Sequence, residues 1–184
     1  MLSNVRIIRF SKELTHTIQL HPRFFGAQLR ESLKKRLYDE VEGTCSGLFG
    51  YIIAVIEIVS IGKGVLQTSS GYAEFLITYK AIVFKPFKGQ VVEGVVTTVN
   101  RMGFFADVGP LQVFVSAHLI PGFLQFDANA NPPAYAGETQ DMQLIKIEKG
   151  ESLRIRILGT RVDATEIFAI GTIKEDYLGP QQEW

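Results

Sequence analysis

KPFKGQVVEGVVTTVNRMGFFADVGPLQVFVSAHLIP, residues 85–121, contains three short apolar segments that favour β-strands. The turn residues Asn100-Arg101-Met102-Gly103 separate the first segment from the second, and Gly109-Pro110 separates the second from the third. Short strands divided by Gly, Pro and Asn are typical of a small closed β-barrel. The sequence therefore predicts a barrel in the second half of the chain.

Strand alternation assigns the aromatic residues of this barrel to opposite faces. Phe104 shares a face with two small apolar residues and is expected to point inward. Phe105 shares a face with Asp107, and Phe114 shares one with Gln112, so both should point outward. Two outward aromatic rings on adjacent strands form a surface on which nucleic-acid bases can stack. The alternative is that these rings cover an interface between domains.

The barrel is expected to resume late in the chain, after a long insertion at about residues 117–148. Residues 152–158, SLRIRIL, alternate cleanly and direct Arg154 and Arg156 outward. Residues 166–173, EIFAIGTI, would supply the closing strand. Placed beside the outward phenylalanines, the two arginines would complete a groove suited to single-stranded nucleic acid.

The first half of the chain predicts a separate α+β domain. Leu29, Leu33, Leu37 and Val41 repeat every four residues, which indicates one buried helix face. Pro86 interrupts an extended segment, so the domains are expected at residues 1–85 and 86–184. The predicted class is α+β and mostly β, with a truncated RNP-like domain before a five-stranded OB barrel. The expected elements of the first domain are a strand at 13–20, a helix at 27–41, and strands at 49–59 and 72–84.

Composition limits the functions that the chain can have. The 19 basic and 19 acidic residues balance, so any attraction of nucleic acid must come from a local patch. The single cysteine excludes an intrachain disulfide. No apolar run is long enough to cross a membrane, and residues 1–12 lack the apolar segment of a secretion signal, so a soluble intracellular protein is expected. The three histidines belong to no recognisable catalytic or metal-binding motif. We therefore expect no enzyme activity, no cofactor and no metal.

The barrel segment resembles the S-one-type RNA-binding domain, an OB barrel. The shared pattern is the Gly-x-Val-Val-x-Gly-x-Val strand at 89–96, the Gly-aromatic turn at 103–104, and an apolar third strand. Phe105 occupies the position of the family's second aromatic residue, whereas Met102 stands where the first is expected. Ser116 replaces the usual histidine, and His118 follows two residues later.

Over roughly residues 10–179, the chain resembles the seventh-subunit family of RNA polymerase stalk proteins, which has a counterpart in archaeal polymerases. The RNA polymerase II branch fits better than the polymerase I or III relatives. The resemblance rests on five strings besides the barrel segment: LHPRFFG (20–26), VEGTCSGLFGYI (41–52), AEFLITYKAIVFKPFKG (73–89), ANPPAY (130–135) and TRVDATEIFAIGTIKEDYLG (160–179).

The resemblance implies a nuclear, non-catalytic subunit that supports transcription initiation. It would pair with the fourth subunit, dock on the polymerase core and offer its barrel to emerging single-stranded RNA. Docking is expected through the tip, which we define as the turn at 21–26 and the loop at 60–71. Its predicted docking residues are His21, Pro22, Phe24, Phe25, Gly26, Gly62, Lys63 and Gly64. Gly62-Lys63-Gly64 lacks the remaining residues of a phosphate-binding loop, which favours a docking turn.

The predicted RNA-binding residues of the barrel are Phe105, Phe114, Arg154, Arg156, Arg101 and His118. Three other functions stay open on the sequence alone. The chain could be a stand-alone RNA-binding protein of translation or decay, the equivalent stalk subunit of another nuclear polymerase, or a structural adaptor without RNA contact. A stand-alone RNA binder would more often repeat the barrel or carry a basic tail, and this chain has neither.

Overall fold

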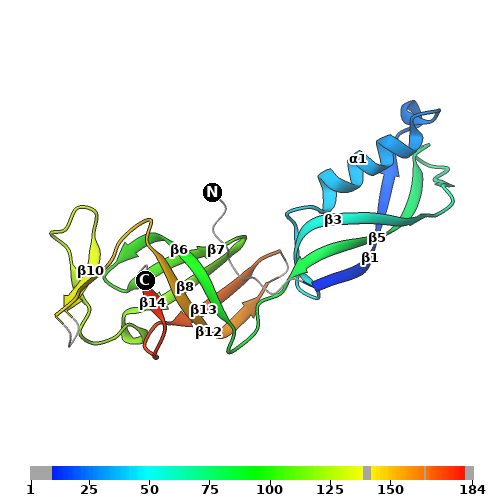
Figure 1. Ribbon diagram of the computed structural model, residues 1–184. Helices are drawn as coiled ribbons and strands as arrows, with labels where there is room; N and C mark the ends of the chain where they lie inside the picture. The colour runs from blue at the N-terminus through cyan, green and yellow to red at the C-terminus, as the bar shows by residue number, and fades with distance from the viewer. Residues whose placement is uncertain (1–9, 139–141, 164, 181–184) are drawn as a thin grey trace. The chain divides into compact units, whose positions relative to one another are not determined.

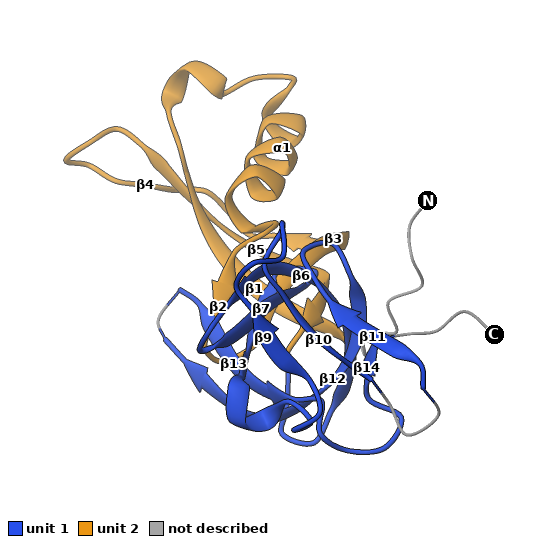
Figure 2. Ribbon diagram, turned by 90° about the vertical axis from the view of Figure 1, so that its left-hand side faces the viewer, with its two compact units in different colours: residues 1–7, 86–184 blue, residues 8–85 orange. Residues whose placement is uncertain are grey.

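The computed structural model describes residues 10–138, 142–163 and 165–180 (Figure 1). The chain divides into two compact units between Lys85 and Pro86. The first unit along the chain, which ends at Lys85, is orange in Figure 2 (unit 2 in its key), and the second, which begins at Pro86, is blue (unit 1 in its key). Strands predominate in both units. The expectation of an α+β protein that is mostly β is confirmed.

The first unit is an antiparallel sheet, in the order β1-β5-β3-β2, with one α-helix packed against it (Figure 1). The buried face of the helix belongs to the same hydrophobic core as Ile18 and Ile77 of the sheet, which are both fully buried. Leu33, Leu37 and Val41 are buried as their four-residue spacing predicts. The elements are β1 (Phe10–Leu20), η1 (Pro22–Phe24), α1 (Leu29–Val41), β2 (Cys45–Ser46), β3 (Gly50–Ile61), β4 (Val65–Leu66) and β5 (Ala73–Phe84).

Strand β3 is irregular along most of its length. Its pairing with β5 shifts register three times, at Ile53, Ile56 and Val59, so each of these residues is an extra residue in a bulge. Within the described residues, β2 pairs only with the start of β3, which leaves the rest of β3 as an edge of the sheet. Ile56 and Val59 are about half exposed along that edge, at 51% and 48%.

The second unit contains a closed barrel of β6 (Val91–Asn100), β7 (Gly103–Val108), β8 (Leu111–Ser116), β12 (Ser152–Val162) and β13 (Ile167–Thr172). The strand order is β13-β8-β7-β6-β12, and pairing of β12 with β13 closes it (Figure 1). Strand β14 (Gly179–Pro180) pairs with the start of β12. Phe104, Val113 and Ile155 are fully buried inside. The predicted five-stranded OB barrel is confirmed.

The insertion between β8 and β12 carries a small sheet of its own, in the order β11-β10-β9. It consists of η2 (Ala117–Leu119), β9 (Gln125–Asp127), β10 (Ala134–Glu138) and β11 (Leu144–Ile147). Tyr135 fixes it to the β6–β7 turn, because its phenol donates to the carbonyls of Asn100, at 2.9 Å, and Arg101, at 3.2 Å. Burial raises the pKa of Tyr135, so the phenol stays protonated as the donor.

Candidate nucleic-acid interface

The aromatic pair, Phe105 and Phe114, lies on the outer surface of the barrel. The two residues are direct cross-strand partners on β7 and β8, with ring centroids 4.9 Å apart and ring planes 41° apart. Both side chains are half-buried, whereas Phe104 is fully buried in the core. The predicted assignment of these phenylalanines to opposite faces is confirmed. The pair presents an apolar surface that is compatible with base stacking.

One end of the barrel brings three further residues close to the aromatic pair. Gly103 and Ser116 are cross-strand partners two positions from Phe105 and Phe114. Beyond them, the Ala117 amide donates to the Met102 carbonyl at 2.9 Å. The Arg101–Met102 turn and His118 therefore lie at the same end, and all three of these residues are exposed. Arg101 and His118 thus lie at the end of the barrel where β7 begins and β8 ends, and their contact with RNA stays a prediction.

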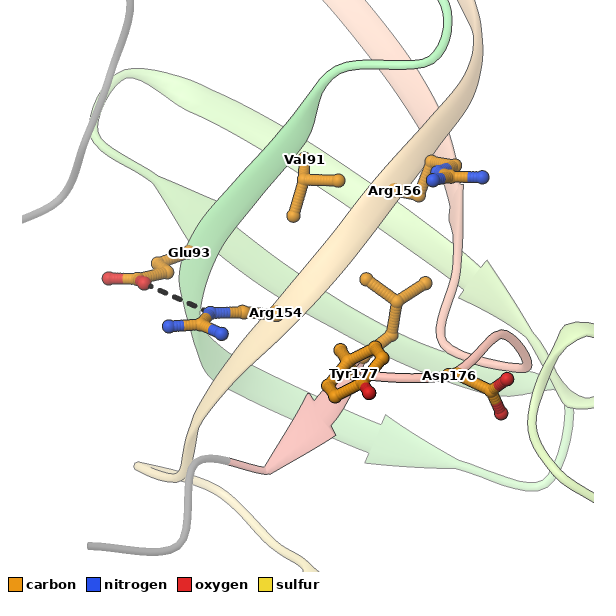
Figure 3. Close-up of a pocket in the computed structure, with 7 residues that line it drawn as sticks. Val91, Glu93, Arg154, Arg156, Asp176 and Tyr177 are labelled. Carbon is orange, nitrogen blue, oxygen red and sulfur yellow. Dashed lines mark hydrogen bonds and ion pairs between the residues drawn. The ribbon is translucent and has the colours of Figure 1, made fainter. Parts of the chain in front are cut away.

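Arg154 and Arg156 line a different pocket, of about 450 Å³, on the outer side of β6 and β12 (Figure 3). Arg154 is the cross-strand partner of Glu93, and its Nε lies 3.3 Å from the Glu93 carboxylate. Arg156 forms an ion pair with Glu175. The other residues that line this pocket are Val91, Asp176, Tyr177 and Leu178.

The structure separates this arginine pocket from the aromatic pair. Arg154 pairs with Glu93 on one side of β6, whereas Phe105 pairs with Thr98 on the other side. Glu93 and Thr98 are five residues apart along β6, which corresponds to roughly 16 Å. Neither phenylalanine lines the pocket of Arg154 and Arg156, so the groove that these four residues were expected to complete together stays a prediction. Alternation directs these side chains outward correctly, but it does not specify which strand lies beside β12.

Two exposed apolar residues of β13, Phe168 and Ile170, extend the surface of the aromatic pair. Strand β13 runs parallel to β8, which places Ile170 beside Phe114 and Phe168 beside Gln112. Their exposed fractions are 46% for Phe168 and 52% for Ile170. Sequence reasoning missed them because EIFAIGTI was interpreted only as the closing strand. Its alternation places Phe168 and Ile170 on one face, and that signal could have identified them.

The predicted tip residues of the first unit are exposed, with Phe24 at 38% and Phe25 at 42%. Pro22 begins η1, and the His21 side chain accepts a hydrogen bond from the Arg23 amide at 3.1 Å. Gly26 follows η1 with a φ of 156°.

The loop that contains Gly62, Lys63 and Gly64 reaches the same end of the first unit. The Tyr72 carbonyl accepts from the Gln67 amide at 2.8 Å, and its ring meets the His21 ring edge-on at 5.2 Å. Gly62 and Gly64 lie against β5, since the Gly62 amide donates to the Leu76 carbonyl at 2.8 Å. Lys63 and the following strand β4 are exposed. The structure thus brings the two segments of the tip together.

Neither a metal-binding cluster nor a membrane-spanning helix is found in the part of the chain that the structure describes. No group of three or more His, Cys, Asp or Glu residues there could hold a metal ion. None of the described helices is both long and apolar enough to cross a membrane.

The second unit is a five-stranded barrel with an outward aromatic pair, and the first unit is a helix packed on a sheet with an exposed tip. These features define a two-domain protein of the S1 RNA-binding class. The family described as "S1 RNA binding domain" matches residues 85–169. The family described as "SHS2 domain found in N terminus of Rpb7p/Rpc25p/MJ0397" matches residues 15–71. Together the two matches cover most of both units.

Curated relatives identify the family more narrowly. The chain is 55% identical to DNA-directed RNA polymerase II subunit rpb7 of Schizosaccharomyces pombe, over 92% of this chain and 97% of that protein. It is 49% identical to DNA-directed RNA polymerase II subunit 7 of Arabidopsis thaliana, over 90% and 92%. The chain therefore belongs to the Rpb7 family of RNA polymerase II subunits. As an accessory subunit, it is not an enzyme on its own.

The comparison also separates the RNA polymerase II branch from another branch. Identity to DNA-directed RNA polymerase IV subunit 7 of Arabidopsis thaliana is only 31%, over 71% of this chain and 74% of that protein. The polymerase II protein of the same plant is 49% identical. The predicted assignment to the polymerase II branch is confirmed.

Proposed function

We propose that this chain is the stalk subunit of nuclear RNA polymerase II and that its barrel binds emerging single-stranded RNA. In this proposal it forms a heterodimer with the fourth subunit, docks on the core enzyme through its tip and supports transcription initiation. Membership of the Rpb7 family supports the assembly. The S1 match supports single-stranded RNA as the ligand of the barrel.

The observation that carries the RNA-binding proposal is the aromatic pair itself. Two half-buried rings in contact on adjacent strands keep an apolar surface open to a base, and stacking tolerates any base because each has a π-face. Arg101 and His118 lie at the end of the pair, where phosphates can be contacted. With no net charge on the chain, we expect weak binding that depends strongly on salt.

The docking proposal rests on the exposed tip. Val65 and Leu66, on the short strand β4, are 64% and 65% exposed, and Phe24 and Phe25 lie on the turn that meets the same loop end. Exposed apolar residues on loops of a rigid scaffold are typical of protein-binding surfaces. The polymerase core is the partner that family membership favours.

The RNA-binding proposal is tested by titrating labelled single-stranded RNA against the full chain and its Phe105→Ala variant. Loss of one stacked base costs on the order of 1–3 kcal/mol, so affinity should fall by about tenfold or more. Tyr177→Ala is the control, because Tyr177 is also an exposed aromatic residue but lines the arginine pocket. Undiminished binding by the Phe105 variant would show that RNA binds elsewhere on the chain, whereas no measurable binding by the parent chain would favour a structural adaptor without RNA contact.

RNA titration of an Arg154→Gln variant shows whether the arginine pocket also contributes to RNA binding. Both arginines of that pocket are already paired with carboxylates, so we expect the Arg154 variant to keep nearly all of its RNA affinity. A loss as large as that of Phe105→Ala would show that RNA contacts both sides of the barrel, and the proposal of a single RNA-binding face would then be wrong.

A further inference from the structure

We infer that Tyr135 is a positioning residue for RNA binding. Through its phenol, the small sheet of the insertion holds the β6–β7 turn, residues 100–103, in the conformation that brings Arg101 to RNA. This inference rests on the proposed RNA-binding function and deepens it. Tyr135 acts through the turn and not by touching RNA, because only 3% of its surface is exposed.

The β6–β7 turn lacks the backbone that tight hairpins prefer. Asn100 and Gly103 are cross-strand partners at the ends of β6 and β7, so Arg101 and Met102 form a two-residue loop. Loops of this length favour turn types in which one or both central residues have a positive φ. The described non-glycine residues with a positive φ lie elsewhere in the chain, so neither central residue of this turn has one. The conformation of the turn therefore depends on hydrogen bonds that hold it in place.

Three groups supply these hydrogen bonds. The Asn100 side chain accepts from the Met102 amide at 2.9 Å, within the turn itself. The Met102 carbonyl accepts from the Ala117 amide at 2.9 Å, just after β8. The Tyr135 phenol donates to the Asn100 carbonyl at 2.9 Å and to the Arg101 carbonyl at 3.2 Å. Since these two carbonyls belong to the peptide groups on either side of the Arg101 Cα, the phenol fixes the backbone from which the guanidinium extends.

The phenol is itself held firmly by the small sheet. Tyr135 lies on the middle strand, β10, where it is the cross-strand partner of Phe126 on β9 and of Ile147 on β11. The rings of Phe126 and Tyr135 are in contact, with centroids 5.5 Å apart. Ile147 is fully buried. The insertion therefore presents a fixed donor to the turn.

A turn that is fixed before RNA arrives favours binding. Arg101 is exposed and lies at the same end of the barrel as the start of β7, which carries Phe105. Ordering a mobile loop on binding costs conformational entropy, and a preorganised loop avoids part of that cost. We therefore expect the phenol to strengthen a phosphate contact by Arg101 without making one itself.

Tyr135→Phe tests this role, because it removes the hydroxyl and keeps the ring. Asn100 is half-buried and Arg101 is exposed, so water can replace the phenol at both carbonyls and the variant should fold. The experiment is titration of a labelled oligouridine of about eight nucleotides, a length that single OB folds bind, against the full chain. Affinity should fall on the order of threefold, and the salt dependence should decrease by about 0.7, the contribution of one single-strand phosphate contact.

A double variant distinguishes positioning from a general loss of stability. If the phenol acts through Arg101, Tyr135→Phe should cause no further loss of RNA affinity in an Arg101→Gln background, because residues that act through one contact are not additive. Additive losses, or a loss without a change in salt dependence, would overturn the inference. Phe126→Leu loosens the ring contact that supports Tyr135, so its effect should depend on Arg101 in the same way. This variant decides the question if Tyr135→Phe does not fold.

Tyr79→Phe is the matched control, since it removes the hydroxyl of a similarly buried tyrosine in the first unit and should leave RNA affinity unchanged. If Phe105→Ala weakens RNA binding while Tyr135→Phe or Arg101→Gln does not, the inference is wrong and RNA binding by the barrel stands. If the parent chain binds no RNA, the proposed RNA-binding function itself fails.

Discussion

Phe104 and Phe105 are neighbours in sequence, yet one side chain belongs to the core and the other to the surface. Phe104 has no exposed area and fills the barrel, so Phe104→Ala should lower the free energy of unfolding by roughly 3–5 kcal/mol. Phe105→Ala should cost less, because its ring is only half-buried against Phe114. Chemical denaturation of both variants, followed by circular dichroism, measures the difference. If the Phe105 variant were strongly destabilised and the Phe104 variant nearly unaffected, Phe105 rather than Phe104 would be the core residue.

For a single side chain, sequence predicts the direction in which it points better than it predicts the residues that it contacts. Alternation with a period of two residues was enough to place Phe105, Phe114, Arg154 and Arg156 on the outside of the barrel. It could not show that β12 lies beside β6, because strand order is a property of the closed barrel. The carboxylate that pairs with Arg154 lies 61 residues away in sequence, and no local pattern identifies it.

Strands and the helix were predictable where a regular pattern of apolar residues extends over many residues. The four-residue spacing on α1 and the turns around β7 and β8 correspond to the observed elements. The small sheet of the insertion was not predicted, because its strands are three to five residues long and show too few alternations. The bulges of β3 were missed as well, since an extra residue in a bulge disturbs the alternation that predicts a strand.

The contact between helix α1 and strand β1 predicts a pH dependence of stability. Burial raises the pKa of Glu40, but hydrogen bonds from Arg36, at 2.8 Å, and His16, at 3.1 Å, outweigh it and hold the pKa below its usual value of 4.5. A carboxyl with a lowered folded-state pKa stabilises the fold above its unfolded pKa. That contribution is lost as the pH falls through the folded value.

Glu40→Gln should therefore destabilise the first unit at neutral pH, and its difference from the parent chain should shrink as the pH falls below about 4. Urea denaturation between about pH 7 and pH 3 measures this difference. Glu31→Gln, in the first turn of the same helix, is the matched control. A difference that does not vary with pH would mean that the charge of Glu40 contributes nothing to the contact.

For the whole molecule, the clearest prediction concerns assembly. A double variant, Val65→Ser with Leu66→Ser, removes two exposed apolar side chains from the tip and leaves the backbone of β4 intact. We expect it to recover less polymerase core in affinity purification from cells, while recovery of the fourth subunit stays unchanged. Leu144→Ser is the control, because Leu144 is similarly exposed, at 70%, but belongs to the insertion of the barrel unit. Loss of the fourth subunit with full recovery of the core would contradict docking through the tip.

The identity of the whole molecule depended on long irregular strings rather than on composition. Balanced charge and an ordinary apolar fraction are shared by many globular proteins and identify none of them. Strings such as LHPRFFG and KEDYLG combine turns, aromatic residues and charges in an order that no periodic pattern produces. The relatives at 55% and 49% identity bear out that reading.

The bulged edge of β3 also affects the kind of aggregate that the purified chain would form. Amyloid fibrils grow when a regular strand edge templates the next copy at every residue. Three register shifts within one strand interrupt such a template at intervals of three residues, although the apolar side chains of Ile56 and Val59 stay exposed. Aggregation of this subunit through the β3 edge should therefore give amorphous precipitate. Fibrils should not grow from this edge.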